Sequence, residues 1–177
     1  MQSESRGLRF VRHPYITLED DKLADAMAIA EFNMTEGDDQ AGNWTFDQTK
    51  RFPYAWTVIK LDDEMIGFIY IMPTFRSYAD DFMHGRITER KLSDDTIENV
   101  TNENYDALVI LSSVIKKEHR NMGYSVRALR DSLSLIEKDK GKLPIYMWFY
   151  TDASRNLAQR VIDHFKTQGT EFYYKTD

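Results

Sequence analysis

One short segment of the sequence combines residue types that suit the binding of a phosphate group. Arg120, Gly123 and Ser125 stand between an apolar run and an amphipathic stretch, which predicts a strand, a turn and then a helix. The first backbone N–H groups of a helix lack intrahelical partners, and the helix dipole adds partial positive charge there. Glycine lets the backbone approach an anion closely, and arginine can donate two parallel hydrogen bonds. The segment therefore predicts a cradle for a pyrophosphate group.

Other interpretations of the same residues stay open from the segment alone. Gly123 would also fit an ordinary helix start, and Arg120 an ordinary solvated charge. The segment is not a P-loop, because no Gly-Lys-Ser/Thr follows, and it lacks two of the three glycines of the dinucleotide-binding fingerprint. His119 could contact a phosphate or simply be solvated. The histidines show no spacing typical of a metal site, so we predict no metal.

Strands alternate with helices in the C-terminal half of the chain. Apolar runs at residues 107–111 and 145–150 are typical of strands buried on both faces, and a third strand is expected at 172–174. Apolar residues at helical spacing predict helices over residues 126–136 and 157–165. A βαβαβ order of this kind predicts parallel neighbouring strands.

The N-terminal half begins with a short strand, expected at residues 7–14. A capping signal at residues 17–20 precedes apolar residues at helical spacing, which predicts a helix that continues to Met34. A second capping box at residues 45–48 begins a short helix that Pro53 ends.

An antiparallel hairpin follows these helices. Residues 56–61 and 65–72 are rich in β-formers and are joined by a polar turn, and Pro73 is expected to end the second strand. Residues 74–104 are polar and poorly periodic, and we interpret them as an insertion. Local helices are expected within it, around residues 87–92 and 94–100.

These elements predict an α/β (α+β) fold with a mixed sheet of six or seven strands, flanked by helices on both faces. The length favours a single domain over residues 1–177, with the polar insertion at about 74–104.

Composition excludes several classes of protein. The chain has 23 basic and 29 acidic residues, a net charge of −6, which argues against nucleic-acid or anionic-membrane binding. Cysteine is absent, so a disulfide scaffold and a cysteine nucleophile are excluded. No apolar run approaches the length of a membrane-spanning helix, and no signal peptide is apparent, so we expect a cytoplasmic protein.

The segment and the order of elements around it resemble the GNAT superfamily of acyl-CoA-dependent N-acetyltransferases. In that family a central strand leads into Arg/Gln-x-x-Gly-x-Gly/Ala and a helix, and Arg120, Gly123 and Ser125 match these positions. Ser125 replaces the usual glycine or alanine, and Lys117 stands where most members carry proline. The order of elements matches over about residues 8–175.

The resemblance implies a GNAT-like sheet, acetyl-CoA as co-substrate and an amine acceptor, either a small molecule or a peptide. The acceptor would attack the thioester directly in a ternary complex. The implied cofactor-binding residues are Val114, Ile115, Arg120, Asn121, Met122, Gly123, Tyr124, Ser125 and Asn156. Backbone groups at Val114 and Ile115 would pair with the pantetheine arm, which would enter a splay between that strand and the strand at 145–150.

The resemblance leaves the catalytic residues unknown. Many members carry a tyrosine acid on the last helix, four residues before a glycine, where this chain has Phe165 before Gly169. A non-catalytic acyl-CoA-binding or sensing domain of the same fold is therefore the alternative, and an unrelated α/β interaction module is a third. Acidic residues could attract a cationic amine or form a solvated face: Glu31, Glu36, Asp38 and Asp39. A homodimer formed through a strand edge is a further possibility.

Overall fold

The computed structural model describes residues 7–32, 46–149, 152–166 and 168–176. Within these residues, six strands form one sheet whose spatial order follows the chain. The strands are β1 (Leu8–Val11), β2 (Trp56–Leu61), β3 (Glu64–Thr74), β4 (Ala107–Ile115), β5 (Ile145–Phe149) and β6 (Phe172–Thr176). β1 to β4 pair antiparallel, whereas β4–β5 and β5–β6 pair parallel. The predicted mixed sheet is confirmed, with the hairpin antiparallel and the C-terminal strands parallel.

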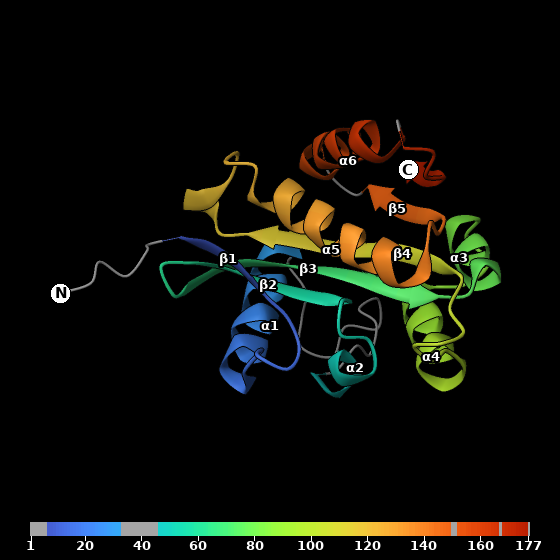
Figure 1. The fold of residues 1–177 in the computed structure, drawn as a ribbon, viewed down its shortest axis with the longest axis horizontal. Helices are drawn as coiled ribbons and strands as arrows, with labels where there is room; N and C mark the ends of the chain where they lie inside the picture. The colour runs from blue at the N-terminus through green and yellow to red at the C-terminus, as the bar shows by residue number, and fades with distance from the viewer. Residues whose placement is uncertain (1–6, 33–45, 150–151, 167, 177) are drawn as a thin grey trace.

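Helices cover both faces of this sheet (Figure 1). They are α1 (Leu18–Phe32), α2 (Phe46–Arg51), α3 (Arg76–Met83), α4 (Glu89–Asn99), α5 (Tyr124–Lys140) and α6 (Asp152–Lys166). A 3₁₀ turn, Lys117–His119, precedes α5. α5 and α6 supply the connections between parallel strands, as a parallel sheet requires. Met34, Glu36, Asp38, Asp39 and Thr45, which the sequence predictions included, lie outside the described residues.

The alternation of side chains along β3 shows which helices cover which face. Ile69 and Ile71 belong to the core beneath α5 and α6, while Phe68 packs with residues of α1 on the opposite face. Met72 packs with residues of α3 and α4, also on that opposite face. None of the helices in the described ranges combines the length and apolar character that a membrane span requires.

Two expectations about residues 73–104 are corrected by the structure. Pro73 does not end its strand: β3 continues to Thr74, with Pro73 opposite Leu108. The pairing of β2 with β3 stops at Trp56 and Tyr70, so Pro73 sits where only β4 is its neighbour, and proline is tolerated on such an edge. The two local helices expected around 87–92 and 94–100 are one helix, α4, and α3 precedes it.

The start of α1 is joined to the sheet through one carboxylate. Asp20 accepts a hydrogen bond from the Thr17 backbone N–H at 3.0 Å, and the Thr17 hydroxyl accepts one from the Asp20 N–H at 3.1 Å. This confirms the predicted capping box. The other Asp20 oxygen lies 2.8 Å from Nζ of Lys60 in β2. Burial would raise the pKa of the Asp20 carboxyl, but the hydrogen bonds from Lys60 and Thr17 lower it below its usual value.

Replacing Asp20 tests this connection. Asp20→Asn keeps a capping oxygen but leaves Lys60 half-buried without its counter-charge, so we expect the free energy of unfolding to fall by about 3 kcal/mol at neutral pH. A carboxyl whose pKa is lowered by folding stabilises the protein above its unfolded pKa of about 3.9, and this stabilisation is lost as the pH falls. Urea unfolding should therefore show the gap between wild type and variant narrowing towards about pH 3. An equal difference in the free energy of unfolding at neutral pH and at about pH 3 would contradict the ion pair between Asp20 and Lys60.

Candidate functional site

β4 leaves its parallel neighbour halfway along its length. β4 pairs with β5 only over Leu108, Val109 and Ile110, although the strand continues to Ile115. On the other side, the register with β3 shifts between Tyr70 and Ile71, so that Leu111 has no opposite residue. This is a β-bulge, and bulges bend the strand that carries them. The splay that was expected between these two strands is present.

Gly67 keeps the end of β4 attached to β3 while β4 parts from β5. Gly67 lies opposite Ile115 in the ladder. A Cβ atom on Gly67 would lie 2.4 Å from the Val114 carbonyl oxygen and 2.5 Å from a side-chain carbon of Ile115. Only glycine permits this close approach of the two backbones. The end of β4 is thereby fixed on one side and open on the other.

A cleft with a volume of about 480 Å³ occupies the space where β4 and β5 part. Its walls come from β4, β5, the turn before α5, the start of α5 and one side of α6. Eight of the nine predicted cofactor-binding residues line it: Ile115, Arg120, Asn121, Met122, Gly123, Tyr124, Ser125 and Asn156. The ninth, Val114, has its side chain buried with the α1 core instead. Their role in binding stays a prediction.

The cleft reaches both faces of the sheet. Ser113 lies opposite Ile69, whose side chain packs beneath α5, so Ser113 is on the α5 face. Ser112 lies opposite Tyr70, which packs against the α1 core, so Ser112 is on the other face. Both serines line the cleft, as does Trp148, which packs with the α3 core. Residues from both faces of the sheet therefore line the cleft where β4 and β5 part.

The start of α5 opens into this cleft. Gly123, the N-cap, has a φ of 77° and no described side chain caps the helix there. A Cβ atom on Gly123 would meet nothing within 4 Å. The Arg127 N–H donates to the Gly123 carbonyl at 3.1 Å, so the amides of the three residues before Arg127 precede the first helical hydrogen bond. These amides and the open space above the glycine form a site that suits an anion.

Arg120 is held at the edge of the cleft by two contacts. Its Nε donates to the Ile115 carbonyl at 3.0 Å, and its guanidinium forms an ion pair with Glu31 of α1. Both charged side chains are partly exposed, and both line the cleft. The arginine is therefore positioned at the anion site, with a carboxylate as its present partner.

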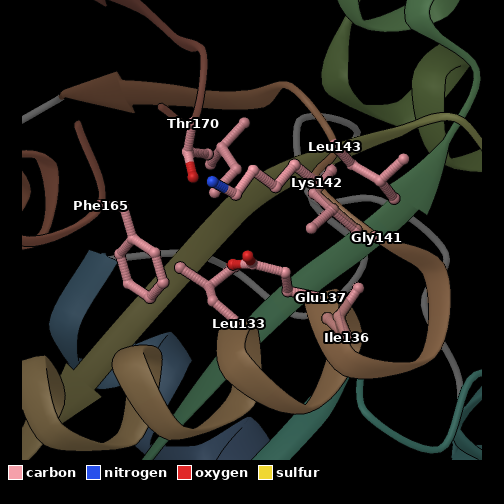
Figure 2. Close-up of a pocket in the computed structure, with 10 residues that line it drawn as sticks. Leu133, Ile136, Glu137, Gly141, Lys142, Leu143, Phe165 and Thr170 are labelled. Carbon is pink, nitrogen blue, oxygen red and sulfur yellow. The ribbon is translucent and has the colours of Figure 1, made fainter. Parts of the chain in front are cut away.

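Phe165 takes no part in the cleft. Its side chain is 1% exposed and lines a separate cavity of about 10 Å³ between α5 and the segment before β6. Figure 2 shows Phe165, Leu133 and Thr170 around this cavity. A cavity of that volume holds about one water molecule. The position at which the family resemblance placed a tyrosine acid is thus a core position in this chain.

The tyrosines near the cleft lie in different surroundings. Tyr146 donates a hydrogen bond to Asp80 at 2.7 Å on the α3 side, and burial followed by this bond raises its pKa above the usual range. Tyr124 lines the cleft at the start of α5, and Tyr150 lies outside the described residues. In the described ranges, no group of three or more acidic or histidine side chains is placed to hold a metal ion.

Among the polar and aromatic residues that line the cleft, sequence reasoning missed four. Ser112 and Ser113 were not singled out, although two serines within an otherwise apolar strand are a recognisable signal. Trp148 and Arg160 also line the cleft. Whether these two residues line the cleft depends on where β4 and β5 separate, and no local pattern in the sequence predicts the point of separation.

Comparisons with known proteins agree with this geometry at the level of the fold. No protein-family model and no curated protein sequence matches the chain. An aminoglycoside acetyltransferase, meta-AAC0020 from an uncultured soil metagenomic sample, solved in complex with sisomicin, superposes with a TM-score of 0.53. The two chains are 12% identical, over 96% of this chain and 97% of the other. The chain therefore has the fold of GNAT-type acetyltransferases, as the sequence resemblance implied.

Two further structural neighbours have lower TM-scores. The loading GNATL domain of CurA from Lyngbya majuscula has a TM-score of 0.48 and 16% identity, over 76% of this chain. This chain spans only 61% of that domain. The diaminobutyrate acetyltransferase EctA from Paenibacillus lautus has a TM-score of 0.43 and 8% identity, over 93% of this chain and 74% of the other.

The ion pair at the cleft gives an electrostatic prediction. Glu31→Gln removes a negative charge beside the anion site, so we expect the affinity for inorganic pyrophosphate to rise about fivefold at low ionic strength. Calorimetric titration measures it, and the gain should shrink as salt is added because exposed charges are screened. Glu64→Gln is the matched control, since Glu64 pairs with Lys116 at 2.5 Å and does not line the cleft. Weaker binding by Glu31→Gln would show that Glu31 positions Arg120 rather than competing for it.

Proposed function

We propose that this protein transfers an acetyl group from acetyl-CoA to the amine of an acceptor, a small molecule or a peptide. Transfer would occur by direct attack in a ternary complex. The observation that supports the proposal most strongly is the cleft between β4 and β5, which opens at the start of α5 and reaches both faces of the sheet. A donor bound from one face and an acceptor bound from the other can meet inside it.

The described residues suit a CoA ligand in two respects. The free amides at the start of α5, with Arg120 beside them, suit its pyrophosphate group. Residues 111–115 of β4 have no β5 partner in the described chain, so their outward backbone groups can pair with an extended arm as an added strand would. Bound acetyl-CoA supplies an acyl group that is activated as a thioester.

The opposite face of the sheet suits a cationic acceptor. Ser112 lies opposite Tyr70, and burial together with the carboxylates of Asp21 and Asp25 raises the pKa of Tyr70 above its usual range. Negative charge on α1 would attract an amine to this face of the sheet. Because the chain has no cysteine, an acyl-cysteine intermediate is impossible, which favours direct transfer.

A second candidate function is a non-catalytic acyl-CoA-binding or sensing domain. The burial of Phe165 in the core favours it, because the family position of the acid is filled by a ring that cannot donate a proton. Both candidates require binding of the acyl-CoA, and they differ only in turnover. A cytoplasmic location and a homodimer stay predictions from the sequence.

A titration with acetyl-CoA tests what both candidates share. Wild type should bind it with measurable heat, and Gly123→Val should weaken binding at least about tenfold, because a β-branched residue resists φ near 77° and displaces the amides. Gly85→Val is the matched control: Gly85 has a φ of 69°, and a Cβ there also meets nothing within 4 Å. Both variants should lose similar stability, and only Gly123→Val should lose affinity. No binding by wild type would refute both candidates.

Release of CoA thiol in the presence of amines separates the two candidates. We expect turnover with at least one cationic amine in a panel that begins with sisomicin, the ligand in the structural neighbour, and extends to diamines and peptides with free amino groups. The rate should rise with pH as the amine loses its proton. Tight acetyl-CoA binding with no thiol release across the panel would favour the sensing domain.

A further inference from the structure

The hydroxyl of Ser113 is an unusual group in this cleft. Its oxygen is enclosed, yet it has no hydrogen-bond partner within the described part of the chain. Leaving a buried hydroxyl unpaired is unfavourable, and such groups in native proteins call for an explanation. Ser113 lies on β4 beyond the last pair with β5, in the wall of the cleft.

The surroundings of Ser113 explain why the protein offers no partner. Its backbone faces β3 through Ile69 on one side and the cleft on the other. Ile110, Val126 and Met147, which line the same cleft on the α5 face, have apolar side chains, and no described residue forms a hydrogen bond with the Ser113 hydroxyl. The Ser113 residue as a whole is only half-buried, and serine passes readily between staggered rotamers, so its hydroxyl can turn into the cleft.

We propose that Ser113 donates a hydrogen bond from its hydroxyl to a carbonyl oxygen of acetyl-CoA, in the acylated pantetheine arm that enters the cleft. This inference rests on the proposed function and adds a specific ligand-binding residue to it. A carbonyl oxygen is the acceptor that an acylated arm carries, either in its thioester or in its amide groups. Ligand binding then satisfies a donor that is unpaired in the free protein.

The same reasoning makes a paired prediction about Ser113→Ala. In the free protein the substitution breaks no hydrogen bond to another described residue and removes an enclosed hydroxyl, so the midpoint of thermal unfolding should stay the same or rise. In the complex it removes one hydrogen bond, so the affinity for acetyl-CoA should fall about three- to tenfold. A residue with a purely structural role would not show stability and affinity moving in opposite directions.

Calorimetric titrations with three ligands complete the test. ADP carries a pyrophosphate but no arm, and Ser113→Ala should bind it as wild type does. Loss of affinity for acetyl-CoA alone assigns the hydrogen bond to the thioester carbonyl, whereas equal loss for CoA and acetyl-CoA assigns it to an amide of the arm. Ser93→Ala is the matched control, because the Ser93 hydroxyl in α4 is buried outside the cleft and has no partner among the described residues. This variant should bind all three ligands normally.

Three results would overturn the inference. Ser113→Ala could bind acetyl-CoA as tightly as wild type, or lose affinity for ADP to the same degree, or unfold at a clearly lower temperature. Each of these leaves the proposed function intact as long as wild type binds acetyl-CoA. Failure of wild type to bind acetyl-CoA would instead refute the proposed function, and with it the ligand on which this inference depends.

Discussion

One extra residue in β4 sets the geometry on which the cleft depends. The bulge at Leu111 bends β4 after its third pair with β5, while Gly67 lets the rest of β4 continue along β3. A parallel pair that stayed together to the end of β4 would bury those backbone groups in the ladder. Because the strands part, one edge of β4 stays available, and residues from both sheet faces share one cavity. The anion site also depends on this bend, since the turn into α5 follows directly from the end of β4.

The cleft carries a region of positive charge although the protein as a whole is negatively charged. The chain carries a net charge of −6, and α1 has three acidic residues in its first turn. Helix amides at the start of α5 and the Arg120 guanidinium nevertheless create a positive region at the cleft, partly balanced by Glu31. In the proposed function, an anionic donor would bind at this positive region and a cationic acceptor would approach from the side of α1. The surrounding negative charge disfavours anions elsewhere on the surface, which concentrates anion binding at the helix start.

Features that depend on neighbouring residues, such as helix caps and turns, could be predicted from the sequence. Features that depend on how distant strands pair were predicted less well. The Thr17–Asp20 capping box, the parallel C-terminal strands and the turn at Gly123 follow from spacing and residue type, and the structure confirms them. α3 was missed although Phe75, Tyr78, Ala79 and Phe82 have helical spacing, because the polar residues between them hid it. Pro73 was wrongly expected to end β3, because a strand tolerates proline only where the neighbouring strand, here β2, no longer pairs with it. The cleft residues of β4 and β5 depend on a bulge that has no local signature.

A buried phenylalanine at position 165, in place of a tyrosine acid, would affect the rate of the proposed acetyl transfer rather than the fold. A CoA thiol resembles a cysteine side chain, whose pKa is about 8.5, so its thiolate is a moderately good leaving group near neutral pH without an acid. A positioned general acid contributes about 10²–10⁴-fold, which is large for an enzyme but small beside the total acceleration that enzymes achieve. The greater requirement is an unprotonated amine held against the thioester. A cleft that holds the proposed donor and acceptor together would address that requirement, because orientation alone can supply about 7–11 kcal/mol of the barrier. Burial of Phe165 is therefore compatible with a slow acetyltransferase as well as with a sensor.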